Sequence, residues 1–207
     1  MQAEPERELE PANGKNTPDN IDAKNVKKPV NIKKEIISWV LPFAVAFVIA
    51  AVVNTFLFQF VRVDGESMCD TLHNGEIMLV TKPEYLFGDP RRGDVVICNY
   101  PDRTEIFVKR VIGIPGDTVE VLRNVVYING KAIDEPYLTE ARNDNGFSMA
   151  AFSLGDNEYF VMGDNRDNSH DSRNYYGHGS PAALTRDMIL GHVQYVLFPF
   201  GSIRGIE

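Results

Sequence analysis

A serine and a lysine that stand 42 residues apart are the residues of this chain best suited to chemistry. Ser67 lies in a Gly-Glu-Ser-Met run, and Lys109 lies in a Phe-Val-Lys-Arg-Val run. A serine hydroxyl becomes a nucleophile only when a neighbouring base removes its proton. Lysine can be that base only when it is neutral, and burial among apolar side chains favours the neutral form because desolvation penalises the charge. On a strand, Lys109 shares a face with Phe107 and Val111, so we expect such burial.

Each of these residues also has a plain structural interpretation. Ser67 is compatible with an ordinary turn serine, because its run fails the nucleophile motif Gly-x-Ser-x-Gly at Cys69, where glycine is required. Lys109 is compatible with a surface lysine that protects an edge strand from aggregation. Cys69 is a rival nucleophile, but the motif around it supplies no base. The local patterns alone leave these alternatives open.

Histidine and metal chemistry are the other options that the residues raise. A Ser-His-Asp triad is a rival mechanism, but all four histidines are compatible with exposed loops or strand ends; they are His73, His170, His178 and His192. The acidic run 163–173 has the composition of a calcium loop, yet a loop that starts at Asp167 puts Ser172 where an EF-hand needs glycine. We therefore expect no metal and no cofactor. The Asp, Asn and Arg residues of this run are better suited to ion pairs and Asx turns.

A run of 25 uncharged residues, Ile36 to Phe60, precedes the candidate nucleophile. As a helix it would be roughly 37 Å long, enough to cross a hydrocarbon core of about 30 Å. A cleavable signal peptide is one alternative, but the only Ala-x-Ala lies inside the run, at residues 44–46. A buried helix of a soluble protein is the other, and it would normally be shorter or show a polar face. We predict a transmembrane helix over 36–60.

The charges around this helix predict its orientation. Five lysines lie within residues 24–35 against one glutamate, and basic flanks stay on the cytoplasmic side. Residues 1–35 would then form a cytoplasmic tail, and its polar, acidic residues 1–22 would be disordered. Residues 61–207 would form an extracytoplasmic domain. That domain carries 14 basic and 22 acidic residues, which is not the footprint of a nucleic-acid-binding protein.

Short runs of β-forming residues separated by turn signals predict a mainly β, antiparallel domain after the helix. The expected strands are 77–80, 93–100, 106–114, 118–122, 124–128, 131–133, 158–162 and 192–200. Helical periodicity outside the membrane segment is confined to residues 181–190, and residues 134–157 resemble an exposed connection. The two cysteines, Cys69 and Cys98, are expected to stay thiols, since a single pair is not a disulfide scaffold.

Taken in order, these runs resemble the type I signal peptidases, the membrane proteases that remove signal peptides from exported proteins. That family has a membrane anchor, a Ser-Met-x-Pro-Thr-Leu box and a Gly-Asp-Val-Val strand. A Lys-Arg-Val-Ile-Gly-x-Pro-Gly-Asp box and a Gly-Asp-Asn-Arg-x-x-Ser-x-Asp-Ser-Arg box follow. This chain shows the five in that order across residues 36 to 177. The last two boxes are long and specific.

The resemblance implies a role for each matching residue. Ser67 would be the nucleophile, Lys109 the general base and Ser169 the group that orients the lysine amine. The remaining boxes imply a supporting set, Asp167, Asp171 and Arg173, completed by Asp164, Asn165 and Arg166. Pockets for small residues at the last and third-last positions before the cut would give an Ala-x-Ala preference, lined by Val63, Met68, Leu72, Phe107 and Val108. The substrate would be an exported preprotein that adds as an extended strand to an open sheet edge.

Two positions depart from the family pattern. Asp70 replaces the family proline, so the turn behind the nucleophile loses a fixed φ, and a carboxylate near Lys109 would raise the lysine pKa. Gly65 stands where some members carry a serine, so the oxyanion would rest on the Ser67 N–H. Two other classes stay open: a self-cleaving Ser/Lys repressor relative, which the anchor disfavours, and a catalytically silent membrane-tethered scaffold, which Asp70 allows.

Overall fold

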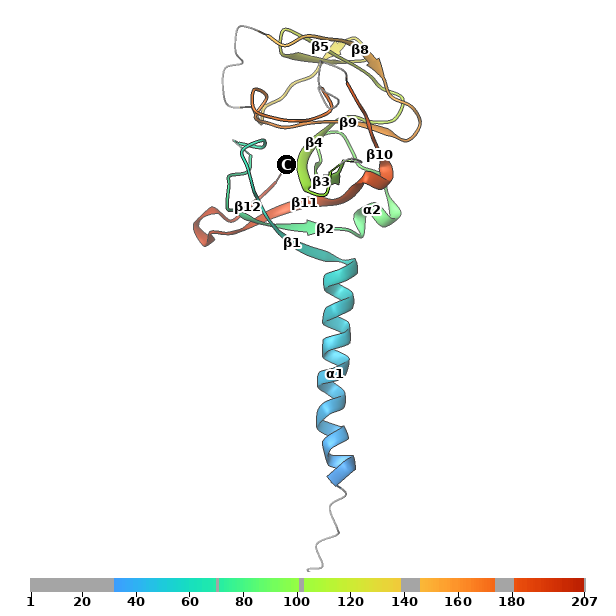
Figure 1. Cartoon of the computed structure of the whole chain (residues 1–207), viewed down its shortest axis with the longest axis vertical. Coiled ribbons are helices and arrows are strands. Elements are labelled where there is room, and N and C mark those ends of the chain that lie inside the picture. The colour runs from blue at the N-terminus through green and yellow to red at the C-terminus, as the bar shows by residue number, and fades with distance from the viewer. Residues whose placement is uncertain (1–31, 70, 101–102, 139–145, 174–180, 207) are drawn as a thin grey trace, which may run out of the picture. The chain divides into compact units, whose positions relative to one another are not determined.

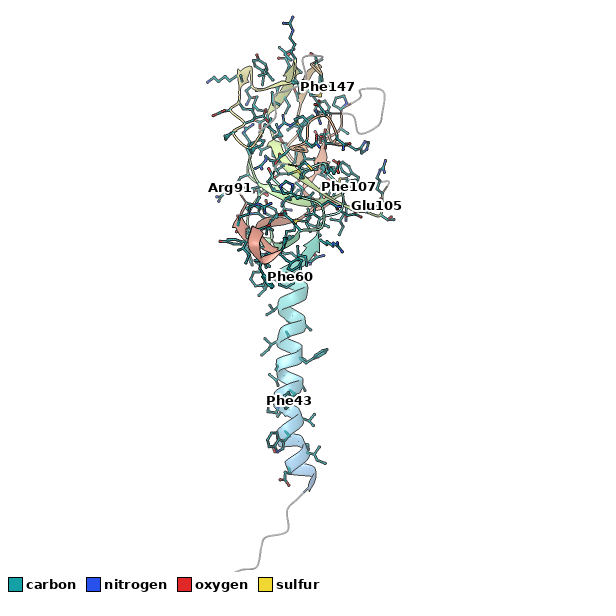
Figure 2. The ribbon with its side chains drawn as sticks, turned by 90° about the vertical axis from the view of Figure 1, so that its left-hand side faces the viewer. Phe43, Phe60, Arg91, Glu105, Phe107 and Phe147 are labelled. Carbon is teal, nitrogen blue, oxygen red and sulfur yellow. The ribbon has the colours of Figure 1, made fainter. Side chains whose placement is uncertain are left out.

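The computed structural model describes residues 32–69, 71–100, 103–138, 146–173 and 181–206 (Figure 1). Helix α1 runs over Ile32–Phe56, and its stretch Glu35–Val53 has a mean hydropathy of 2.7 and is not buried against the rest of the chain. It is the one helix among the described residues that is long and apolar enough to cross a membrane. Phe43, which is 71% exposed, projects from it (Figure 2). The predicted disorder of residues 1–22 lies outside the described residues.

The apolar run that predicts a helix to Phe60 contains two kinds of structure. The helix ends at Phe56, and strand β1 begins at Phe58. Residues Phe58 to Arg62 pair with the second strand of the sheet, from Thr81 back to Ile77. A lipid-facing helix and a sheet strand both need apolar residues, so hydropathy alone does not mark the change.

The rest of the chain is a large antiparallel sheet with a smaller one, which confirms the predicted fold class. The strands of the large sheet are, in order, β1 (Phe58–Arg62), β2 (Ile77–Thr81), β11 (Ile189–Phe198), β3 (Val95–Asn99), β4 (Ile106–Gly113), β9 (Glu158–Met162) and β10 (Leu184–Thr185). A short strand, β12 (Arg204–Gly205), pairs with β11. The helical turns within this domain are α2 (Glu84–Phe87), η1 (Arg186–Met188) and η2 (Phe200–Ser202).

Three of the four strands of the smaller sheet form two successive hairpins with two-residue turns. The order of this sheet is β7 (Lys131–Ala132), β6 (Val125–Ile128), β5 (Thr118–Leu122) and β8 (Met149–Ser153). Arg123 and Asn124 both have positive φ, as do Asn129 and Gly130, which is the conformation of a type I′ turn. Both turns were expected from the sequence. In Figure 1, β5 and β8 lie on the far side of β9 from β11 and β2.

Three clusters of buried side chains hold these sheets together. Two of them pack against the large sheet, one around Val111 and Val161 and the other around Leu72 and Met78. The third joins the small sheet to β4 and β9 through side chains that include Phe160. Strand β3 is buried at four consecutive positions, Val95–Cys98, because packed groups cover both of its faces.

Two expectations about the chain after β7 are wrong. Residues 181–190 are not a helix, because Leu184 pairs with Tyr159 on β9, and β11 has already begun at Ile189. Residues 134–157 are not simply an exposed connection, because β8 lies within them and Glu135 is buried. In both segments tertiary pairing overrides the local pattern.

Candidate active site

Ser67 lies in a tight turn between β1 and β2. Gly65 precedes it with a φ of 105°, a conformation that residues with a side chain rarely adopt. The turn closes through the Leu72 N–H, which donates to the Met68 carbonyl at 2.8 Å. Asn165 holds the turn from outside, since its backbone N–H donates to the Ser67 carbonyl at 3.1 Å and its side-chain amide to the Glu66 carbonyl at 3.1 Å. The Ser67 position is therefore fixed from both sides.

Lys109 reaches Ser67 from the middle of β4. Strand pairing sets Lys109 opposite Val96, and only 1% of the lysine is exposed. Its Nζ lies 2.7 Å from Ser67 Oγ and donates to the Val108 carbonyl at 3.0 Å. The Nζ also lies 5.5 Å from the centre of the Phe107 ring. One hydrogen bond thus joins two residues that are 42 positions apart in the sequence.

Burial lowers the pKa of Lys109 below its ordinary value of 10.5. The Cys98 thiol and the Asp171 carboxylate oppose this shift, while Arg173 adds to it. The net direction favours a neutral amine, and a neutral amine in contact with a serine hydroxyl can accept its proton.

Asp171 and Arg173 form a buried ion pair next to the loop that holds Ser67. Arg173 Nη2 lies 2.8 Å from Asp171 Oδ2, and the Gly163 N–H donates to the same carboxylate at 3.0 Å. Burial raises the pKa of Asp171, but the hydrogen bonds and the charge of Arg173 outweigh it and hold that pKa below its ordinary value. The lowered pKa favours the ionised form of Asp171, and its carboxylate accepts the hydrogen bond from Gly163.

A second buried ion pair, between Arg110 and Asp164, is absent from the roles assigned by sequence. Arg110 donates to both Asp164 oxygens, and the Thr71 hydroxyl donates to the same carboxylate at 2.5 Å. One clue was available: strand alternation puts Arg110 on the face opposite Lys109, and a buried arginine requires an acidic partner.

The segment after β7 adds a third pair. Both Arg166 Nη atoms donate to the carboxylate of Glu135, whose side chain is fully buried, and Arg166 Nε donates to the Gly163 carbonyl at 3.0 Å. Tyr137 donates to Glu135 at 2.8 Å, and its ring lies 3.9 Å from the Arg110 guanidinium. Sequence reasoning placed Glu135 and Tyr137 in an exposed connection and missed them.

Other predicted site residues lie less directly at the dyad. Ser169 Oγ is buried beside Gly163; among the described residues it has no hydrogen bond of good geometry, and its hydroxyl helps to lower the pKa of Asp171. Asp167 is exposed. Leu72 is fully buried in the core cluster around Met78 and does not line a cavity described below. Asp70 lies outside the described residues.

Ser67 lines two cavities. The apolar-walled cavity, about 340 Å³, is lined by side chains that include Val61, Val63, Met68, Ile106, Phe107 and Val108. The polar cavity, about 500 Å³, is lined by residues that include Asp64, Glu66, Asn74, Asn168, His170 and Lys109. Four of the predicted pocket residues thus line the first cavity: Val63, Met68, Phe107 and Val108.

The rival groups are placed differently from Lys109. His192 pairs with Glu84 at 2.8 Å, and His73 is exposed. His170 is exposed and lines the polar cavity, and His178 lies outside the described residues. The two cysteines, both within the described ranges of the chain, are not joined in a disulfide. Burial raises the pKa of the Cys98 thiol to about 12. Among the residues that the structure describes, no group of three or more His, Cys, Asp or Glu side chains could hold a metal ion.

Known proteins are similar to this chain over most of its length. A family model described as "Signal peptidase, peptidase S26" matches residues 36–198. Signal peptidase I S of Bacillus subtilis (strain 168) is 42% identical over 84% of this chain and 96% of its own length. Signal peptidase I of Bacillus licheniformis is 39% identical over 86% and 97%. Signal peptidase IB of Staphylococcus aureus (strain COL) is 35% identical over 84% and 95%. A crystal structure of a signal peptidase I from Enterococcus faecalis V583, 30% identical, covers 51% of this chain and 97% of its own with a TM-score of 0.42.

Proposed function

The chain belongs to the signal peptidase family, peptidase S26, and from this premise we propose that it cuts preproteins with a Ser67/Lys109 dyad. The observation that carries the proposal is the 2.7 Å contact between Ser67 Oγ and the Nζ of a lysine that is only 1% exposed. A charged lysine in that position would be costly, whereas a neutral one is a base in contact with its nucleophile.

The reaction follows from this contact. Lys109 Nζ takes the Ser67 proton as Oγ bonds to the carbonyl carbon before the cut, and the oxyanion that forms rests on the Ser67 N–H. The carbon–nitrogen bond then breaks, and the Lys109 ammonium returns its proton to the leaving amine. Water, deprotonated by Lys109, hydrolyses the Ser67 ester, and the proton passes back to Oγ. In each step one proton moves to or from Lys109.

Two strand edges are available to an extended substrate. Residues 106–109 of β4 pair with β3, while pairing with β9 begins only at Arg110. Strand β1 pairs with β2 along Phe58–Arg62. The ends of both strands, at Val61–Val63 and Ile106–Val108, line the apolar-walled cavity. A substrate segment added here would put alternate side chains into that cavity.

The cavity walls support an Ala-x-Ala preference. Met68 and Val63 are buried, and Phe107 and Val108 are half-buried, so these side chains are held by the core and cannot move aside for a large substrate side chain. Small residues at the last and third-last positions before the cut would fit such walls. Leu72 supports Met68 from the core rather than contacting the substrate.

The orientation across the membrane rests on the lysines before helix α1. The tail would be cytoplasmic and residues 61–207 extracytoplasmic, where exported preproteins emerge. An external protease added to intact spheroplasts should digest the large domain and spare the tail. Protection of the large domain until lysis would contradict this orientation.

Cleavage of a short Ala-x-Ala peptide by the full chain in detergent tests the dyad. Ser67→Ala and Lys109→Ala should each lose about a thousand-fold or more in kcat/KM. Lys109→Arg should fail as well, because a guanidinium stays charged. Lys131→Ala, which changes an exposed lysine of β7, is the matched control and should cleave normally. Substantial turnover by Ser67→Ala or Lys109→Ala would remove the dyad, and an inactive wild type would favour a silent scaffold.

A further inference from the structure

The two cavities beside Ser67 differ in their chemistry, and the base faces only one of them. Ser67 and Phe107 line both cavities. Lys109 lines the polar cavity and is not among the described residues that line the apolar-walled one. The placement of the base distinguishes the two sides of the cut.

The direction of the substrate follows from the proton that the leaving amine needs. That proton comes from the Lys109 ammonium, so the leaving nitrogen must lie on the side of Ser67 where Nζ is reachable. The acyl portion, with its small side chains, then occupies the apolar-walled cavity. On the basis of the proposed function, we propose that the polar cavity receives the first residues of the released protein, and that Glu66 and Asp64 make it favour cationic over anionic side chains there.

The charges that line the polar cavity are mainly negative. Glu66 and Asp64 are both exposed, while Asn74 and Asn168 are neutral. Lys109 carries no charge when it acts as a base, and His170 is the other basic residue of this lining within the described chain. A lysine or arginine side chain would be attracted to this wall, and a glutamate or aspartate would be repelled.

The two carboxylates should not contribute equally. Asp64 also lines the apolar-walled cavity, together with Arg62, Arg103 and Glu105. The two arginines balance the two acidic residues of this lining, so the net charge around Asp64 is small. Glu66 lines only the polar cavity and not the apolar-walled one, and its backbone carbonyl accepts a hydrogen bond from the Asn165 side chain. We therefore expect Glu66 to determine most of the preference.

Three matched peptides test this assignment on the full chain in detergent. They share one Ala-x-Ala segment and differ only at the second residue after the cut, which is Lys, Gln or Glu. At an ionic strength of about 0.02 M, kcat/KM should follow the order Lys, Gln, Glu, with roughly two- to ten-fold between the extremes. At about 0.5 M the spread should shrink towards one, because salt screens exposed charges.

Variants then identify the source of the preference. Glu66→Gln should remove most of the spread, Asp64→Asn less, and the double variant nearly all of it. Asp156→Asn changes an exposed carboxylate outside both cavities and should keep both the spread and the basal rate.

The outcomes separate this inference from the proposed function. Equal cleavage of the three peptides by an active enzyme, a preference for Glu, or a spread that survives in the double variant would overturn the inference and leave the dyad intact. Failure of the wild type to cut any of the three peptides would overturn the proposed function and the inference with it.

Discussion

Arg110 and Asp164 form an ion pair in which both side chains are almost completely buried, with 2.8 Å between Nη2 and Oδ2. The pair joins β4, which carries Lys109, to the loop whose Asn165 holds the Ser67 carbonyl. Thr71, from the nucleophile turn, donates to the same carboxylate. A charge pair on the opposite face of β4 therefore links the strand of Lys109 to the turn that carries Ser67.

Removal of one partner of this pair should destabilise the domain strongly. Arg110→Met leaves the Asp164 carboxylate buried without its counter-ion, which typically costs about 3–5 kcal/mol. Thermal unfolding of the detergent-solubilised chain measures the loss. The double variant Arg110→Met/Asp164→Leu removes both charges and should recover some of the lost stability. A single variant as stable as the wild type would show that the pair is not a structural link.

The burial of Lys109 should lower the free energy of unfolding of the chain. The pKa of Lys109 is lower in the folded chain than in the unfolded one, so the unfolded chain binds more protons between the lowered pKa and 10.5. The free energy of unfolding should rise with pH through that window, and the penalty is complete below it. Lys109→Met should abolish this slope and raise the midpoint of thermal unfolding near neutral pH by a few degrees. A lower midpoint in Lys109→Met would show that the amine is a net stabilising contact.

The pH dependence of activity in Asp70 variants tests Lys109 as the base. If the Asp70 carboxylate lies near Lys109, it favours the ammonium and shifts the rising limb of activity upward. Asp70→Asn should then move that limb downward or leave it unchanged, and Asp70→Pro should cleave at least as well as wild type near neutral pH. The measurement is kcat/KM of peptide cleavage against pH. An upward move in Asp70→Asn would mean that the carboxylate helps the lysine stay neutral.

Glu135 should position the nucleophile from a distance. It holds Arg166, which binds the Gly163 carbonyl next to the loop that fixes Ser67. Glu135→Gln should lower kcat roughly ten-fold with little change in KM, because the misplaced group is the nucleophile and not the substrate wall. The rising limb of activity against pH should not move, because the substitution leaves Lys109 unchanged. Glu120→Gln, a partly exposed carboxylate of β5, is the control. An unchanged kcat in a folded Glu135→Gln would contradict this role.

Cys69 should be dispensable. It is partly exposed two residues after Ser67, and Lys109 Nζ bonds to the serine oxygen. Cys69→Ala should keep most of the peptide activity, and thiol reagents should inhibit the wild type only through their bulk. Complete loss of activity in a folded Cys69→Ala would shift the mechanism to a thiol protease.

The sequence was sufficient for the features of the site that depend on local pattern. The β-branched run around Lys109 predicts the strand, whereas the local pattern left the burial of the lysine open between a core position and an edge position. The positive-φ turns at 123–124 and 129–130 follow from their residue types. The partners of Arg110 and Glu135 could not be predicted because they come from other segments, 54 and 31 residues away. Residues 181–190 contain good helix formers, but Leu184 and Thr185 pair with β9, a 3-10 turn follows at Arg186–Met188, and Ile189 pairs with β3.

Gly163 shows how little clearance the site allows. A methyl group on its Cα would collide with the Ser67 carbonyl oxygen and with Ser169 Oγ. The turn that carries Ser67 and the loop 163–173 therefore pack against each other with only the Gly163 backbone between them. Even the methyl group of alanine is too large for this position. A copy of this chain with every reactive group intact but a side chain at position 163 would fold with its two loops forced apart. We therefore expect a side chain at position 163 to lower peptide cleavage by displacing Ser67, even with Ser67 and Lys109 unchanged.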